Sequence, residues 1–363
     1  MSRADRVARV RERMGVLGVD ALLLSLGADL PWLTGYEAMP LERLTMLVLP
    51  ADGDATLVVP RLEAPRVDHD PALFGLRPWG ESEDPVAIVA GLVGARAMLA
   101  VSDRTWATFV LQLQASRPAA SWQAASLVTG PLRAVKDADE IAALRRAGAA
   151  ADRVATAVVG GDVAMVGRTE AEVAADIHAR LRAEGHDKIN FVIVGSGPNS
   201  ASPHHEPGGR RIGAGEAVVC DFGGTVDGYC SDTTRTVFTG PPPAEFRDLY
   251  AAVQRAQSEA VDAAVVGMPC EDVDGVARRV IEEAGYGPHF VHRTGHGIGL
   301  EEHEDPYLVG GNCQALVAGH AFSIEPGIYL EGRWGARIED IVVATADGPS
   351  SLNTVSHDLA VVA

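Results

Sequence analysis

The sequence AVVCDFGGTVDGYCSDTTRTVF, residues 217–238, has two β-prone runs on either side of a short turn. Ala217 to Phe222 is an apolar run typical of a buried strand, and Asp227-Gly228 is a common hairpin turn. We therefore predict a β-hairpin whose second strand runs from Ser231 to Phe238.

Each predicted strand carries one aspartate, Asp221 in the first and Asp232 in the second. We expect them to face each other across the hairpin, with a β-bulge absorbing an offset of a residue or two. Directly opposed positions lie about 5 Å apart at Cβ, which suits two carboxylates that hold cations about 3.5 to 4 Å apart. Without cations the two carboxylates would repel each other.

Three further candidate ligands follow: His296 in RTGHGIGLEEHEDP, Glu325 in FSIEPGIYL and Glu339 in ARIEDIVV. We predict that Ala321–Leu330 and Ala336–Val343 form another strand pair, each strand supplying one glutamate. Four carboxylates and one imidazole make an oxygen-dominated ligand set that suits two divalent ions better than one. The alternative is that these are ordinary buried or turn-capping carboxylates.

In this order, the motifs CDFGG, SDTTRT, HRTGHGIGLEEHEDP, SIEPGIY and ARIED resemble the pita-bread metallopeptidases. That family includes methionine aminopeptidase, aminopeptidase P and prolidase, with creatinase as a relative without metal. The resemblance extends from about Pro131 to the C-terminus. It implies an α+β fold with a catalytic pita-bread domain over residues 131–363, which hydrolyses peptide bonds with a metal-bridging hydroxide.

The resemblance also implies a role for each ligand. Asp221 would bind one ion through both oxygens, Asp232 and Glu339 would bridge the two ions, and His296 and Glu325 would complete the second ion's shell. Glu325 would in addition handle the proton of the attacking water. We expect two divalent metal ions, Mn²⁺ first, with Co²⁺ or Zn²⁺ as alternatives, because affinity order alone does not choose the ion.

Three more histidines match family positions that contact the substrate. His204 in SASPHH would face the substrate, whereas His292 and His303 would contact the substrate carbonyl or the developing gem-diolate. An imidazole there can donate a hydrogen bond to an oxygen that gains charge. Arg337 would orient the ligands and help to bind the substrate; the alternative is an exposed strand arginine.

Other residues of chemical interest receive structural interpretations. Cys220 is predicted to pack on the opposite strand face from Asp221. The glycines of GHGIG do not fit a phosphate-binding loop, and we expect them to let the backbone approach metal and substrate closely. Seven histidines match no motif and are predicted to have surface or capping roles: His69, His178, His186, His205, His289, His320 and His357.

The first 130 residues are predicted to form a smaller α/β domain. DALLLS followed by PWLTGY resembles the N-terminal domain shared by aminopeptidase P, prolidase and creatinase, which methionine aminopeptidases lack. Between two predicted strand regions, DLPWLTGYEAMPLERL is interpreted as a loop with exposed aromatic residues. The remaining predicted elements of this part are an amphipathic helix with Val7, Val10, Met14 and Leu17 on one face, and strands at Asp20–Ser25, Leu44–Pro50 and Ala55–Pro60.

The predicted domain boundary is Gly130-Pro131. Two helix starts after it carry capping-box signals, Asp137 with Glu140 and Thr169 with Glu172. The other elements predicted for this part are a strand over Asn190–Val194 and helices over Phe246–Val266 and Cys270–Ala284.

Composition narrows the possible partners and compartment. A chain of 363 residues can hold two domains, and its net charge of −18 argues against nucleic acid and anionic membranes as partners. The four cysteines are too scattered for a disulfide framework, and no apolar run is long enough for a membrane span. The start also lacks the apolar core of a signal peptide, so we expect a cytoplasmic protein, as a homodimer.

The expected substrates are small peptides with proline at the second position. An Xaa-Pro amide has no N–H and a fixed φ, so a site shaped around the ring can accept what a general peptidase excludes. A dipeptidase should hold the substrate's C-terminal carboxylate with a cation, for which the candidates are Arg293, Arg333 and, from a partner's N-terminal domain, Arg43. Some prolidases have an arginine just after HExP, where this chain has Tyr307, so aminopeptidase P and prolidase both stay open. Alternatives are a methionine aminopeptidase and a pita-bread binding module without catalysis.

Overall fold

The computed structural model describes all residues from 1 to 363 and divides into two compact units, Met1–Arg133 and Ala134–Ala363. Helix α5 (Ser126–Ala134) runs through the expected boundary at residue 130, with Pro131 inside it. We describe each unit by itself.

The N-terminal unit is built on a six-stranded sheet with the order β4-β3-β2-β1-β5-β6. Strands β1, β2 and β3 pair antiparallel, whereas β4, β5 and β6 each join in parallel. The strands predicted around DALLLS and the Asp52-Gly53 turn are confirmed, since they form β1, β2 and β3. The bounds are β1 Ala21–Leu24, β2 Met46–Pro50, β3 Thr56–Pro60, β4 Gly75–Trp79, β5 Met98–Val101 and β6 Ser121–Ala124.

The helices of this unit begin with the predicted amphipathic helix α1, which starts at a capping box of Ser2 and Asp5. Val10 and Met14 of α1 are fully buried, whereas Leu17 at its end is exposed, so the apolar face is shorter than predicted. The remaining helical bounds are α1 Arg3–Leu17, α2 Asp29–Thr34, η1 Ala64–Arg66, α3 Pro85–Gly91, α4 Ala107–Ser116 and α5 Ser126–Ala134.

The prediction of a loop with exposed aromatic residues after β1 is wrong. Helix α2 occupies the start of that segment, and both Trp32 and Tyr36 are buried. Pro31 lies in the first turn of the helix, where its missing N–H has no partner to lose. Gly35 then ends the helix in the left-handed conformation, with φ of 76°. Proline and glycine here bracket a short helix instead of a loop.

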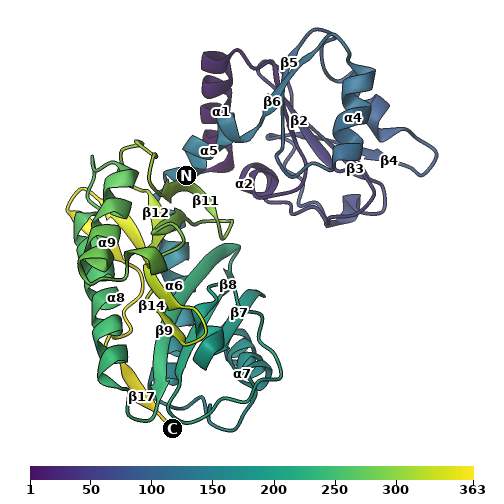
Figure 1. The fold of residues 1–363 in the computed structure, drawn as a ribbon. Coiled ribbons are helices and arrows are strands. Elements are labelled where there is room, and N and C mark those ends of the chain that lie inside the picture. The colour runs from purple at the N-terminus through teal and green to yellow at the C-terminus, as the bar shows by residue number, and fades with distance from the viewer. The chain divides into compact units, whose positions relative to one another are not determined.

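The C-terminal unit contains the predicted hairpin, formed by β8 (Ala217–Val226) and β9 (Tyr229–Thr239). Its two-residue turn has φ of 52° at Asp227 and 80° at Gly228, as the Asp-Gly signal requires. With β7 (Lys188–Ser196) and β17 (Ala360–Val362), the hairpin makes a four-stranded sheet of order β17-β9-β8-β7. Figure 1 shows the long β8 and β9 ribbons beside helix α6.

The second sheet of this unit corrects one predicted pairing. The expected pair of long strands is interrupted at both glutamates, so that β12 pairs with β15, whereas β13 pairs with β14. Pro326 follows Glu325 and cannot donate a ladder hydrogen bond, which explains the first interruption. The five-stranded sheet has the order β11-β10-β12-β15-β16. Its bounds, with the β13–β14 pair, are β10 Gly295–Gly297, β11 Glu304–Leu308, β12 Ala321–Ile324, β13 Gly327–Leu330, β14 Trp334–Arg337, β15 Asp340–Thr345 and β16 Gly348–Ser351.

Two helix pairs cover these sheets. Helices α6 and α7 start at the two predicted capping boxes and pack with β7 to β9, while α8 and α9 pack on each other and on the second sheet. No helix in the structure is both apolar and long enough to traverse a bilayer. The bounds are α6 Ala138–Val159, α7 Glu170–Ala183, η2 Gly197–Ala201, α8 Ala244–Ala263, α9 Cys270–Glu283 and η3 Gly287–His289.

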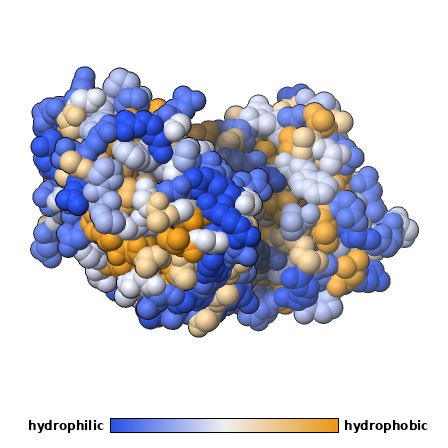
Figure 2. All heavy atoms as spheres, turned by 60° about the horizontal axis from the view of Figure 1, so that its bottom comes forward, coloured by the Kyte–Doolittle hydropathy of each residue, from blue (hydrophilic) through white to orange (hydrophobic).

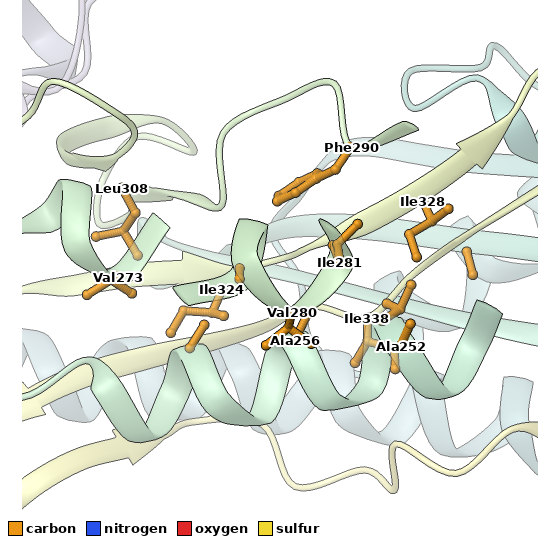
Figure 3. Packing of buried hydrophobic residues seen from close by; sticks show 14 of the residues in the cluster. Ala252, Ala256, Val273, Val280, Ile281, Phe290, Leu308, Ile324, Ile328 and Ile338 are labelled. Atoms are coloured by element: carbon orange, nitrogen blue, oxygen red, sulfur yellow. The ribbon is translucent and has the colours of Figure 1, made fainter. Parts of the chain in front are cut away.

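The core beneath α8 and α9 anchors the strands on either side of the two candidate glutamates (Figure 3). Small residues of α8, Ala252 and Ala256, let α9 approach closely. Ile324 and Ile338 are fully buried in this cluster, and each immediately precedes one of the two candidate glutamate ligands. Figure 2 shows a face on which hydrophilic residues predominate, with smaller hydrophobic areas between them.

Candidate metal centre

The regular hairpin ladder places both aspartates on one face. Asp221 pairs with Thr234, and Asp232 pairs with Gly223, so the two carboxylates are diagonal neighbours two positions apart. Because side chains alternate with a period of two, an offset of two keeps both on the same side of the sheet. The expected bulge between β8 and β9 is therefore wrong, since the ladder needs none.

The two glutamates and the histidine reach this face from the other sheet. Glu339 forms an isolated bridge with Thr234, whose hydroxyl donates to Glu339 Oε2 at 2.7 Å. The Glu325 backbone N–H donates to the Thr294 carbonyl at 2.8 Å, which holds it beside His296 of β10. Glu325 lies between β12 and β13, and Glu339 lies between β14 and β15. Neither glutamate is part of a regular strand, and each makes one of these contacts instead.

All five predicted ligands converge. In the groups Asp221, Asp232, Glu339 and His296, Glu325, Glu339, the ligand atoms lie within 4.8 Å of one another. His296 Nε2 is 3.3 Å from Glu325 Oε1 and 3.7 Å from Asp232 Oδ2, which joins the two groups. Glu339 is common to both of these groups, and Asp232 and His296 form a third such group with His303.

The electrostatics of the cluster favour cations. Burial and the neighbouring carboxylates hold the pKa of Asp232 and of Glu339 well above their usual range. Burial also raises the pKa of Asp221, and its Oδ1 atom is buried without a protein partner. A buried, unpaired carboxylate oxygen among like charges is costly unless a cation binds it. The donor set thus fits hard divalent ions.

One side-chain cation compensates part of this charge. Arg337 is 2% exposed, so the alternative of an exposed strand arginine is wrong. Its Nη2 donates to Asp221 Oδ2 at 2.6 Å, and its Nε donates to the Thr234 hydroxyl at 3.1 Å. Arg337 therefore fixes one Asp221 oxygen and leaves the other free to face the cluster.

The five residues line one cavity of about 290 Å³, together with the predicted substrate contacts His204, His292 and His303. Partial burial and the adjacent His296 lower the pKa of His303 to about 4, and the two rings lie 3.9 Å apart between centroids. His303 is therefore neutral at pH 7 and keeps one N–H to donate.

His292 is more constrained than the sequence suggested. Its Nε2 lies 2.8 Å from the Tyr329 hydroxyl, and its Nδ1 lies 2.7 Å from the Arg293 carbonyl. Because the Arg293 carbonyl can only accept, His292 donates through Nδ1, and Nε2 of the neutral ring accepts from the Tyr329 hydroxyl. The Tyr329 oxygen in turn accepts from Arg337 at 2.7 Å. Burial lowers the pKa of His292, which keeps this neutral arrangement. Both ring nitrogens thus have protein partners, and a direct bond to the substrate would have to replace one of them.

Of the three arginines considered as carboxylate anchors, Arg293 alone lines the cavity. Its guanidinium lies 4.5 Å from the centroid of the Tyr307 ring and has no acidic partner. Arg333 forms two 2.7 Å hydrogen bonds with Glu245. Arg43 is paired with Glu81 within its own N-terminal unit, and its role as an anchor supplied by a partner chain stays a prediction.

Two of the histidines that match no motif, and Cys220, have structural roles within the C-terminal unit. His186 and His320 are buried, so a surface role is wrong for both. His186 fits the predicted capping role, because its Nδ1 lies 3.0 Å from the carbonyl oxygen of Leu181 in the last turn of α7, and its Nε2 lies 2.9 Å from the Ser231 hydroxyl. Cys220 packs in the apolar cluster under β8, as predicted, and burial raises the pKa of its thiol to about 12.

The glycines of GHGIG serve the sheet. A Cβ at Gly295 would lie 1.9 Å from the Ser323 carbonyl oxygen, and one at Gly297 would lie 2.2 Å from that of Asp305. Gly295 and Gly297 thus let neighbouring strands approach closely, and the expected close approach of this backbone to metal and substrate stays a prediction.

Sequence reasoning missed the apolar wall of the cavity, Phe191 and Ile193 of β7, and the bridging Tyr329. Ile193 pairs directly with Asp221, so it lies on the same face of the sheet. Once β7 is placed beside β8, the alternation of side chains identifies both apolar residues.

Comparison with known proteins agrees with this geometry. Residues 142–346 match metallopeptidase family M24, and residues 6–135 match the creatinase/prolidase N-terminal domain. The dipeptidase PepE from Mycobacterium ulcerans is 47% identical with a TM-score of 0.93, covering 99% of this chain and 97% of that one. A prolidase from Thermococcus sibiricus is 36% identical with a TM-score of 0.94, covering all of both chains. The Xaa-Pro dipeptidase from Bacillus anthracis is 26% identical with a TM-score of 0.91, also covering all of both.

Proposed function

The chain belongs to metallopeptidase family M24, and we propose that it hydrolyses Xaa-Pro dipeptides with two divalent metal ions. The observation that carries the proposal is the convergence of four carboxylates and one imidazole in a cavity with an apolar wall and an unpaired arginine. The names of its structural relatives, dipeptidase, prolidase and Xaa-Pro dipeptidase, support it.

We assign Asp221, Asp232 and Glu339 to one ion and His296, Glu325 and Glu339 to the other, with Asp232 close to both. When bound, two such ions lower the pKa of a water molecule and polarise the scissile carbonyl. All four carboxylates line the cavity, and we assign the transfer of a proton to Glu325 because its side chain is the most exposed of them, at 16%.

The cavity histidines hold the substrate. The neutral His303 donates its N–H to the carbonyl oxygen as that oxygen gains charge, the kind of interaction that stabilises a tetrahedral transition state. His204 is exposed at the cavity lining and can adjust to the substrate backbone. His292 acts mainly by fixing Tyr329 and, through it, Arg337.

The proline preference follows from the apolar wall. Phe191 and Ile193 offer surface to a ring that has no backbone N–H to satisfy. A general peptide substrate would bring a donor to this wall without a partner, which costs binding energy.

The preference for dipeptides rests on Arg293. A free α-carboxylate after proline would meet this guanidinium, which Tyr307 holds by stacking. We therefore assign the anchoring cation to position 293, in place of the arginine that follows HExP in some prolidases. An aminopeptidase P should have no need of an unpaired cation there.

A pair of peptides tests this proposal. We expect faster hydrolysis of Ala-Pro than of Ala-Pro-Gly by the Mn²⁺-loaded protein, and Arg293→Met should remove the difference by raising KM for the dipeptide. Equal turnover of both peptides would favour aminopeptidase P, and cleavage of Met-Ala peptides alone would favour a methionine aminopeptidase.

Reconstitution with Mn²⁺, Co²⁺ or Zn²⁺ identifies the preferred ion, and analytical ultracentrifugation tests the proposed homodimer. We further propose a cytoplasmic location.

A further inference from the structure

A buried carboxylate outside the cavity organises the loop that carries His204. Glu170 is the first residue of α7 and is completely buried. Its Oε1 accepts hydrogen bonds from the Ser196 backbone N–H at 2.9 Å and the Ser196 hydroxyl at 2.8 Å. The Asn199 side-chain amide donates to both Glu170 oxygens, at 3.1 and 3.2 Å. One carboxylate thus holds the end of β7 and the start of η2.

The same carboxylate also holds the far side of the loop. Glu170 Oε2 lies 2.8 Å from His205 Nε2, and His205 directly follows His204. Between the Asn199 and His205 contacts lie Pro203 and His204, which both line the cavity. The lining segment is therefore fastened at both ends to one side chain that never reaches the cavity.

The charge of Glu170 suits this task. Burial opposes its ionisation, but the hydrogen bonds from His205, Ser196 and Asn199 outweigh burial and lower its pKa. An ionised carboxylate accepts from all of these donors at once, which a neutral side chain of the same shape cannot do. Nothing in the proposed reaction uses Glu170, and α7 already has its own capping box of Thr169 and Glu172.

We propose that Glu170 is a positioning residue that acts on the substrate through His205 and His204. This inference rests on the proposed function in one respect, namely that His204 contacts the substrate. A purely structural Glu170 would only join α7 to β7. If Glu170 positions His204, replacing Glu170 should not affect turnover in a protein that lacks the His204 side chain.

A double-mutant cycle tests this directly. In Mn²⁺-loaded protein with Ala-Pro, Glu170→Gln should lower kcat/KM about tenfold, the lower end of the loss seen when a hydrogen-bonded partner behind a functional group is removed. In the His204→Ala background, Glu170→Gln should cause no further loss. Glu172→Ala weakens the same helix end without touching the loop, and it should leave kcat/KM unchanged. Equal losses from Glu170→Gln in both backgrounds would overturn the proposal.

A second set of variants covers the case in which Glu170→Gln folds poorly. His205→Ala removes one contact of Glu170 and should reproduce the loss of kcat/KM, whereas His205→Gln keeps a donor and should restore most of it. If both His205 variants behave like the unaltered protein, the proposal fails.

A measurement without turnover separates this inference from the proposed function. In metal-free protein with ¹³C-labelled histidine, the NMR signal of the His204 ring should shift or broaden in Glu170→Gln and His205→Ala, and stay unchanged in Glu172→Ala. An unaltered protein inactive on every Xaa-Pro peptide would refute the proposed function alone, because the NMR comparison still decides whether Glu170 positions His204. An unchanged His204 signal in both variants would refute the positioning role.

Discussion

Replacing Asp232 by asparagine should make the metal-free protein more stable while it abolishes turnover. Asp232 is 4% exposed, and Glu339 and Asp221 repel its charge. The variant Asp232→Asn removes one charge from this cluster at nearly constant volume. It also removes a ligand that we assign close to both ions.

The structure sets a limit to the gain. A carboxyl can escape repulsion by staying protonated, which at pH 7 costs about 1.36 kcal/mol for each of the roughly 3 pH units above its ordinary pKa of 3.8. Burial and repulsion of the Asp232 charge together therefore cost the metal-free protein at most about 4 kcal/mol. The buried asparagine amide forms imperfect hydrogen bonds, which offsets part of this stabilisation. We therefore expect the substitution to raise the unfolding free energy of the metal-free protein by about 2 kcal/mol. For a unit of this size, that raises Tm by about 4 to 8 °C.

Differential scanning calorimetry with chelator and with Mn²⁺ measures both parts. The Tm of the chelated Asp232→Asn protein should exceed that of the chelated unaltered protein, and Mn²⁺ should raise Tm much more for the unaltered one. The control variant Asp262→Asn, on the exposed side of α8, changes the net charge by the same amount. It should neither raise the Tm of the chelated protein nor weaken the response of Tm to Mn²⁺. A chelated Asp232→Asn protein that melts earlier than its parent would refute this reasoning, as would an equal Mn²⁺ response of the two proteins.

Three further predictions concern other parts of the C-terminal unit. Arg337→Met should lower kcat/KM by about 10- to 100-fold and weaken Mn²⁺ binding in calorimetric titrations, because Asp221 loses its orienting partner; unchanged Mn²⁺ affinity would contradict this. Burial lowers the pKa of His320 to about 4. The unfolded chain therefore takes up a proton below pH 6.5 that the folded protein refuses, so folding stability falls by up to about 3 kcal/mol between pH 6.5 and 4. In urea unfolding of metal-free protein, the His320→Gln variant should lose less unfolding free energy over this pH range than the unaltered protein. Parallel pH profiles of unfolding free energy for the two proteins would refute this role of His320. Ala256→Leu should cost about 1 to 3 kcal/mol of unfolding free energy by overpacking α8 against α9, whereas Ala251→Leu on the exposed face should cost little; equal effects would place the helix contact elsewhere.

The hairpin was predictable from local sequence, and its register could have been as well. With a two-residue turn at Asp227-Gly228, counting back from the turn pairs Asp221 with Thr234 and leaves Asp232 on the same face without a bulge. The offset between Asp221 and Asp232 could therefore have been predicted from the length of the turn alone. The capping boxes of α6 and α7 were likewise local signals, and the structure confirms both.

The meeting of the two sheets was not predictable from local pattern. Glu339 reaches the hairpin through its bridge to Thr234, a contact between residues about a hundred positions apart, which no alternation or turn signal encodes. Glu325 and Glu339 were found because their motifs resemble a family. The same limit explains Trp32, whose burial depends on packing within the N-terminal unit and not on its neighbours Pro31 and Gly35.

The most direct test of the central claim is to count the metal ions. After equilibrium dialysis against Mn²⁺, elemental analysis should find two ions per chain, and Ala-Pro hydrolysis should disappear on chelation and return with the ions. A saturated protein that holds fewer than two ions, or that hydrolyses Ala-Pro equally well after complete chelation, would contradict a pair of cations held by Asp221, Asp232, His296, Glu325 and Glu339.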